Sequence, residues 1–291
     1  MSPAGTGEIP ARLDADSTRA VHMRRMIGSR GALYSFVIGI VGAMVLGAWL
    51  REPLVMLGGV VFVVLAIAAI CFRAADRRAE EEFFLSFACA RGFAYVPRAE
   101  LLPLTPLLGA GDRRECRHWM QGPLGEGLPQ CGLGHYAFRV RHGNGKGERW
   151  TSHDFTVCVV EIEQGIVLYP GLFVARRRDL VDRLGEGHWL NTSSRRSVEL
   201  ESEALHERCE VWVERSQDDV QLLRLFSPSF VSWLAEHPLH PCFEYRAGTL
   251  VVYLERRLED AGRLSWMLDA TAEIARRLRD EVGEAGVSRA A

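Results

Sequence analysis

The sequence predicts an α+β protein in which an N-terminal two-helix transmembrane hairpin precedes a cytoplasmic domain with a mainly antiparallel sheet and flanking helices. The first observation is a pair of apolar runs within residues 31–72, interrupted only by Arg51, Glu52 and Pro53. The second is the alternation of apolar and polar residues that recurs between turn residues from position 134 onward. The third is that helical patterns follow groups of strands, which argues against a doubly wound parallel sheet.

The apolar runs have the length of membrane-spanning helices. Residues 31–50 and 54–72 each extend far enough, at about 1.5 Å per residue, to match a hydrocarbon core of about 30 Å. The outer flanks are rich in arginine, whereas the turn holds Arg51 alone; the flanking residues are Arg19, Arg24, Arg25, Arg30, Arg73, Arg77 and Arg78. The positive-inside rule therefore predicts a two-pass protein of the bacterial inner (plasma) membrane with both termini cytoplasmic. Buried helices of a water-soluble core and a cleaved signal peptide are the alternatives, and both fit two consecutive runs less well.

Small residues recur every four positions in the first run, at Gly39, Ala43 and Gly47. Such spacing allows the backbones of two helices to approach closely. We expect packing against the second helix of the same hairpin, with self-association into a homo-oligomer as the alternative. Neither run contains an acidic or basic side chain, which predicts an anchor and not a transporter.

The predicted organisation has five parts. Residues 1–30 are polar at first and basic towards the end, which indicates a disordered segment with a short basic stretch. The transmembrane hairpin takes residues 31–73, a helical connector 74–96, the cytoplasmic α+β domain 97–282 and a disordered tail 283–291. Helical spacing in the connector predicts one buried face and a stop at Gly92; that face consists of Phe83, Phe84, Phe87 and Ala90.

Strand signals dominate the domain. Alternating residues 134–142 and 153–163 flank a Gly-rich turn and predict a hairpin, and a loop-rich segment before them holds one short strand at 116–120. A second hairpin is expected at 243–255 with its turn at Ala247-Gly248. Further strands are expected at 166–177, 197–201 and 208–214, with a short excursion at 203–207 before the last.

Two helical segments accompany these strands. The first runs from Asp218 or Asp219 to about residue 237, with a break or restart at Ser227-Pro228. Its buried side is predicted to consist of Val220, Leu223, Phe230 and Leu234. The last helix is expected over residues 260–282.

Composition limits the classes of partner. The formal net charge is −2, and without a strongly basic balance no nucleic-acid partner is expected. Seven cysteines at irregular spacing, without a C-x-x-C pair, favour free thiols in a reducing compartment over a disulfide framework. No cofactor motif is present, so the expected partners are the lipid bilayer and a protein at the membrane.

One segment could ligate a metal ion. His237, His240 and Cys242 place two imidazoles and a thiol within six residues, and zinc accepts such ligands when His206 or Cys209 completes the set. The prolines at 238 and 241 explain the segment equally well as a rigid loop between a helix and a strand. This set is the basis of an alternative function, a metal-assisted hydrolase acting at the membrane face.

Other chemical patterns are explained more simply. Gly143–Gly147 contains Lys146 but is followed by a strand and not by a helix, so a hairpin turn fits better than a phosphate-binding loop. Ser152, His153 and Asp154 are neighbours along one strand and cannot form a triad there. An arginine-rich stretch could contact anionic lipid or be ordinary solvated surface; it comprises Arg176, Arg177, Arg178, Arg183, Arg195 and Arg196.

Several short blocks resemble a group of bacterial two-helix membrane proteins that is defined only as a domain of unknown function. They are A-R-G-F-A-Y at 90–95, R-R-S-V-E-L-E-S at 195–202, C-E-V-W-V at 209–213, L-F-S-P-S-F-V-S-W-L at 225–234 and F-E-Y-R-A-G-T-L-V-V-Y at 243–253. The resemblance implies a membrane hairpin followed by a domain of the same layout, and it implies no activity or site residue. The expected function is a membrane-anchored binding or assembly module without catalysis, and no catalytic residue is predicted.

Overall fold

The structure is a computed structural model of the 291-residue chain. It describes residues 53–143, 147–176, 194–200 and 202–290. The chain divides into two compact units, residues 1–87 with 259–261 and residues 88–258 with 262–291. The predicted N-terminal segment 1–30, the first apolar run and its small residues Gly39, Ala43 and Gly47 lie outside the described residues.

Helix α3 runs without a break from Pro53 to Arg91. It ends as predicted at Gly92, whose φ of +69° is accessible to glycine without strain. The amide of Gly92 donates to the Cys89 carbonyl at 3.2 Å and that of Phe93 to the Ala88 carbonyl at 2.8 Å. These two bonds form a Schellman motif, which satisfies the last carbonyls of the helix.

The predicted transmembrane hairpin is contradicted. Within the described residues no helix combines the length and the apolar character that crossing a bilayer requires. The helix of the second apolar run continues through the charged residues of 73–82 to Arg91, as the predicted helical connector implies. The transmembrane part of the predicted fold, and the two-pass inner-membrane localisation derived from it, are therefore corrected.

The described side chains of α3 differ along its length. Val61, Phe62, Leu65 and Ile70 are at least half exposed. In the predicted connector the three phenylalanines are buried as expected, whereas Ala90 is exposed.

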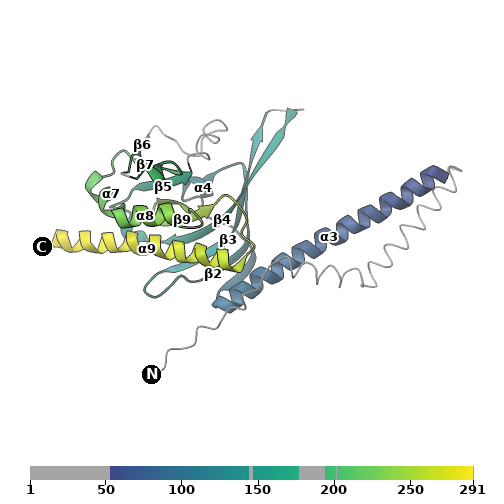
Figure 1. Cartoon of the computed structure of the whole chain (residues 1–291), viewed down its shortest axis with the longest axis horizontal. Helices are drawn as coiled ribbons and strands as arrows, with labels where there is room; N and C mark the ends of the chain where they lie inside the picture. The colour runs from purple at the N-terminus through teal and green to yellow at the C-terminus, as the bar shows by residue number, and fades with distance from the viewer. Residues whose placement is uncertain (1–52, 144–146, 177–193, 201, 291) are drawn as a thin grey trace, which may run out of the picture. The chain divides into compact units, whose positions relative to one another are not determined.

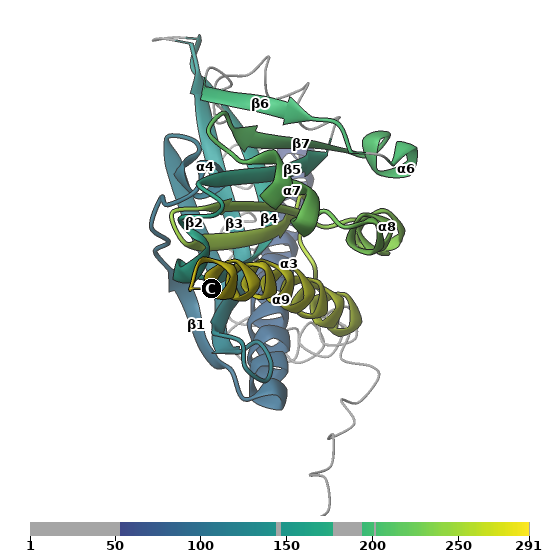
Figure 2. The ribbon, with the colours of Figure 1, turned by 90° about the vertical axis from the view of Figure 1, so that its left-hand side faces the viewer.

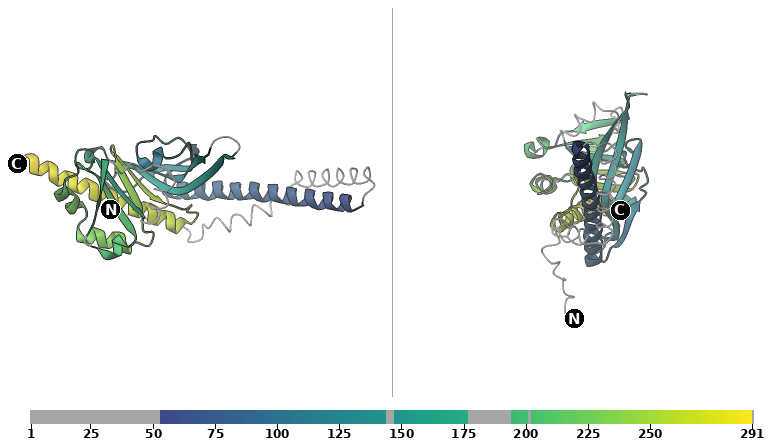
Figure 3. Two further views of the ribbon diagram at one scale, coloured as in Figure 1. Left: turned by 90° about the horizontal axis from the view of Figure 1, so that it is seen from above. Right: turned by 90° about the vertical axis from the view of Figure 1, so that its right-hand side faces the viewer.

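Nine strands of the described residues form one antiparallel sheet in the order β1-β2-β3-β4-β9-β8-β5-β7-β6 (Figures 1 and 2). The large antiparallel sheet with flanking helices is therefore present as predicted. The strands are β1 Ala94–Ala99, β2 Arg113–Pro123, β3 Gln130–His142, β4 Arg149–Glu161, β5 Gly171–Arg176, β6 Arg195–Val198, β7 Cys209–Glu214, β8 Cys242–Arg246 and β9 Thr249–Leu254. The predicted hairpin around Gly143 is the β3–β4 pair, which extends beyond the neighbouring strands in Figure 3.

Helices cover the two faces of the sheet unequally. The helices are α4 Pro106–Gly109, α6 Glu203–His206, α7 Asp219–Leu225, α8 Pro228–Glu236 and α9 Ala261–Ala290, and η2 Glu163–Gly165 is a 3-10 turn. Figure 2 shows α6, α8 and α9 on one face and α4 on the other. On the α4 side, Leu107 and Leu108 pack in a cluster with aromatic residues of β3, β4 and β9. Helix α9 reaches Ala290 and thus extends past the end predicted at 282.

The β8–β9 turn confirms the predicted hairpin. Ala247 and Gly248 have φ values of +49° and +79°. Two successive residues with positive φ are the geometry of a type I′ turn, whose twist matches that of the flanking strands.

The helical segment after Asp218 is divided into α7 and α8, as the Ser227-Pro228 pair predicts. The buried side predicted for its first half is wrong. Val220 and Leu223 are 61% and 63% exposed, and Leu222 and Leu225 are buried in their place. The chain leaves helical geometry at Phe226, where ψ is +50°. The buried positions of α7 and α8 therefore do not follow one continuous helical repeat.

Candidate functional site

The residues predicted to bind a metal ion do not form a group of three ligands within the described residues. His237 follows α8, and its Nδ1 accepts a hydrogen bond from the Leu239 amide at 3.2 Å. A ring nitrogen of His240 lies 3.3 Å from a guanidinium nitrogen of Arg208, which disfavours a second cation at the same place. Cys242 is buried in the apolar cluster on the α4 side of the sheet.

The surroundings of His237 and His240 favour the neutral form of both imidazoles. Burial, followed by the positive charge of His240, lowers the pKa of His237, and burial followed by the charge of Arg208 lowers the pKa of His240. Among the described residues, however, no group of three or more His, Cys, Asp or Glu side chains could hold a metal ion. The structure gives the metal-assisted hydrolase no support.

The Ser152-His153-Asp154 sequence alternates across β4, as strand geometry requires. His153 stacks on Phe138 of β3 with ring centroids 4.9 Å apart, and Ser152 and Asp154 point to the opposite face. Ser152, His153 and Asp154 therefore do not form a triad with one another.

The predicted basic stretch is not one surface in the part of the chain that the structure describes. Residues 177–193 lie outside that part. Arg195 is buried beside Glu214 and over the ring of Phe173, and Arg196 pairs with Asp219. Neither arginine is a freely solvated cation.

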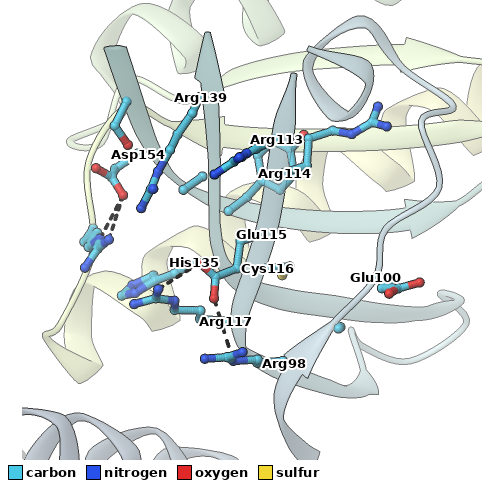
Figure 4. A pocket seen from close by; sticks show the side chains of 15 residues that line it. Arg98, Glu100, Arg113, Arg114, Glu115, Cys116, Arg117, His135, Arg139 and Asp154 are labelled. Carbon is cyan, nitrogen blue, oxygen red and sulfur yellow. Dashed lines mark hydrogen bonds and ion pairs between the residues drawn. The ribbon is translucent and has the colours of Figure 1, made fainter. Parts of the chain in front are cut away.

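A pocket that the sequence did not predict lies across β1–β4. Its volume is about 560 Å³, and its charged lining has six arginines against three carboxylates (Figure 4). The charged residues are Arg98, Arg113, Arg114, Arg117, Arg139, Arg257, Glu100, Glu115 and Asp154. We call the sheet face that carries Arg113 and Arg139 the pocket face.

Strand register assembles this pocket. Arg113 of β2 lies opposite Arg139 of β3, which lies opposite Ser152 of β4. Two residues further along, Glu115, Ala137 and Asp154 form the next row on the same face. Directly opposed residues of an antiparallel pair project to the same side, so these two rows define the pocket face.

A third row closes one end. Arg98 of β1 lies opposite Arg117 of β2, which lies opposite His135 of β3. Arg114, in contrast, alternates to the other face and donates to the Gly109 carbonyl at 3.3 Å. Five of the six arginines are thus available to the pocket face.

Two of the three carboxylates that line the pocket are paired with arginines. Glu115 accepts a hydrogen bond from Arg117 at 2.8 Å and lies 3.7 Å from Arg98. The hydrogen bond from Arg117, supported by the charges of Arg117, Arg98 and Arg139, lowers the pKa of the Glu115 carboxyl. Asp154 accepts two bonds from Arg257, at 2.7 and 3.2 Å. Glu115 and Asp154 are therefore both engaged as hydrogen-bond acceptors.

The remaining positive charge is concentrated in one row. The guanidinium of Arg113 lies 4.7 Å from the ring centroid of Trp150, a cation–π contact that leaves its charge uncompensated. Arg139 forms no side-chain hydrogen bond or ion pair within the described residues, although its charge contributes to the low pKa of Glu115. Arg113 and Arg139 are therefore opposite each other in the β2–β3 register, and within the described residues neither forms an ion pair with a carboxylate.

The loop between β9 and α9 borders the pocket and is fixed to its floor. Thr156 of β4 donates to the Arg256 carbonyl at 2.8 Å and accepts from the Leu258 amide at 3.0 Å. His135 hydrogen-bonds the Leu258 carbonyl at 3.1 Å. Since a carbonyl only accepts, this ring nitrogen carries the proton. The loop that carries Arg257 is thus held in place by side chains of the sheet.

The sequence does contain a signal for this pocket. Arginines and carboxylates occupy every second position at 113, 115 and 117, and again at 139 and 141. A strand that places charge on one face over several residues either faces solvent or lines a polar site. The cross-strand register, which sequence does not supply, is what brings these residues together.

No family model, curated protein or solved structure matches the chain. The resemblance to a group of two-helix membrane proteins remains a prediction.

Proposed function

We propose that this protein is a binding module whose β1–β4 pocket holds a small anionic ligand. The observation that carries the proposal is the Arg113–Arg139 pair. Like charges directly opposite each other on neighbouring strands destabilise a sheet. An anion between the two guanidinium groups removes that repulsion, so the pocket is organised for a bound anion.

Arginine is suited to this task. Its planar guanidinium matches phosphate and carboxylate groups with two parallel hydrogen bonds and stays charged at every physiological pH. Trp150 holds the Arg113 guanidinium by stacking, which reduces the side-chain freedom lost when the anion binds.

The side chains of the pocket are suited to binding a ligand, and those that could act as nucleophile or base are not placed to do so. Burial raises the pKa of the Cys116 thiol to about 12, so its nucleophilic thiolate is absent at neutral pH. Asp154 is engaged by Arg257, and His153 lies on the opposite face from Ser152. These features support a binding role in preference to acyl transfer.

Calorimetric titration of the full chain with inorganic phosphate at low ionic strength tests the proposal. We expect saturable binding at one site, and Arg139→Gln should weaken it by about tenfold or more, because it removes a charge-assisted hydrogen-bond donor.

Arg149→Gln provides the matched control. Arg149 is exposed on β4 next to Trp150, but it alternates to the face opposite the pocket. Arg149→Gln changes the net charge by the same amount as Arg139→Gln and should alter the affinity for phosphate by about twofold at most. Absence of saturable binding, or an equal loss in both variants, would show that the pocket is not the anion site.

A further inference from the structure

The pocket has an internal polarity that narrows the class of ligand. One row holds Arg113, Arg139 and Ser152, and the next holds Glu115, Ala137 and Asp154. The rows are two residues apart along the strands, which corresponds to about 7 Å. A ligand that covers both rows meets cations at one end and hydrogen-bond acceptors about 7 Å away.

The acceptor row can bind donors despite its existing ion pairs. The side chains of Glu115 and Asp154 are 35% and 40% exposed. A carboxylate has about four acceptor sites, and the arginine contacts leave some of them open on each side chain. Because each carboxylate is already paired with an arginine, a neutral group that is rich in hydrogen-bond donors suits this row better than a further charged group.

The acceptor row has its smallest side chain at its centre. Ala137 lies between Glu115 and Asp154 in the cross-strand register and lines the pocket, and we call the space above its methyl group the hollow. Figure 4 shows that Glu115 and Asp154 come from different strands of the sheet. The size of the residue at 137 therefore sets how deeply the donor end of a ligand enters.

Resting on the proposed anion site, we infer that the ligand is a small phosphorylated polyol. Its phosphoryl group lies between Arg113 and Arg139, and its hydroxyl groups donate to Glu115 and Asp154 above Ala137. Inorganic phosphate satisfies only the first row, and an unphosphorylated sugar only the second.

Calorimetry with glucose 6-phosphate, inorganic phosphate, glucose and phosphoethanolamine tests this inference. Glucose 6-phosphate should bind about tenfold more tightly than phosphate, a difference that one or two additional hydrogen bonds supply. Glucose alone should give no measurable binding. Tighter binding of phosphoethanolamine than of glucose 6-phosphate would overturn the polyol assignment in favour of an ammonium group.

The Ala137→Val variant tests the polyol inference separately from the proposed anion site. Valine is compatible with a strand and fills the hollow without changing any charge. It should reduce glucose 6-phosphate affinity to that of inorganic phosphate while phosphate binding itself is kept. Equal affinities for both ligands in the wild type would overturn the polyol inference and leave the anion site standing, whereas absence of binding for every probe would overturn both.

Discussion

The indole of Trp119 on β2 lies in the space that a side chain at Gly132 of β3 would occupy. A Cβ placed on Gly132 would come within 1.8 Å of the Trp119 ring, and Gly134, two residues along, lies 3.0 Å from the same ring by this measure. The two glycines give the ring a flat surface on β3. The packing accompanies an irregularity between Arg117 and Met120, where β2 shifts its register against β3.

We therefore expect Gly132→Val to destabilise the fold by about 3 kcal/mol, because the indole has to leave its place or the strands have to separate. Urea denaturation of the full chain measures the effect. Gly147→Ala is the control, since a Cβ at Gly147 meets no atom within 4 Å. Equal stabilities of the two variants would refute the packing described for Trp119.

Glu244 should stabilise the fold by accepting a hydrogen bond from a buried amide. It is 1% exposed, and its carboxylate oxygens lie 3.0 and 3.2 Å from the Leu107 amide at the start of α4. Glu244→Ala leaves that buried amide without its acceptor and should lower the free energy of unfolding by about 3 kcal/mol. Glu244→Gln retains a carbonyl oxygen and should recover part of the loss in the same denaturation assay; no recovery would argue against the hydrogen bond as the cause.

Arg195 and Arg196 are adjacent on β6 but should differ in importance. The Arg195 side chain is 3% exposed, lies over Phe173 and pairs with Glu214, whereas Arg196 pairs with the exposed Asp219. Arg195→Ala leaves Glu214 without its partner and should cost about 3 kcal/mol, against less than about 1 kcal/mol for Arg196→Ala. Thermal unfolding of both variants checks the order, and a larger loss for Arg196→Ala would contradict it.

Phosphate-ester binding should depend on pH through the ligand. The second pKa of a phosphomonoester is about 6, so the ligand gains negative charge from pH 5 to pH 7 and should bind more tightly to arginines whose charge does not change. Glu115 does not titrate in this range, because the hydrogen bond from Arg117 holds the pKa of that carboxyl below its ordinary value of 4.5. Sulfate keeps its charge across these pH values, so its affinity should stay constant; a parallel rise for sulfate would place the titrating group on the protein.

Local signals in the sequence predicted much of the domain. Ala247-Gly248 between two alternating runs specifies a tight turn, and Ser227-Pro228 interrupts a helical pattern, because both depend only on the conformations open to neighbouring residues. The prediction of the buried face of α7 was wrong because the chain departs from helical geometry at Phe226. A helical repeat counted across that residue assigns the wrong positions to the buried face.

The transmembrane interpretation was wrong, since no helix within the described residues has the length and apolar character to cross a bilayer. The continuation of the helix beyond residue 72, in contrast, was predicted from the spacing of its apolar residues and is confirmed by the 39 residues of α3. The pocket was missed because it depends on contacts between residues distant along the chain. Arg113 and Arg139 are opposite each other only through the β2–β3 register, and Asp154 joins Arg257 across 103 positions.

The most direct test of the account is a crystal structure of the full chain soaked with tungstate, a heavy tetrahedral analogue of phosphate. The account predicts an anomalous peak between the guanidinium groups of Arg113 and Arg139, within hydrogen-bond distance of both. A fully ordered pocket without tungstate, or tungstate bound only at arginines outside the β1–β4 pocket, would contradict it.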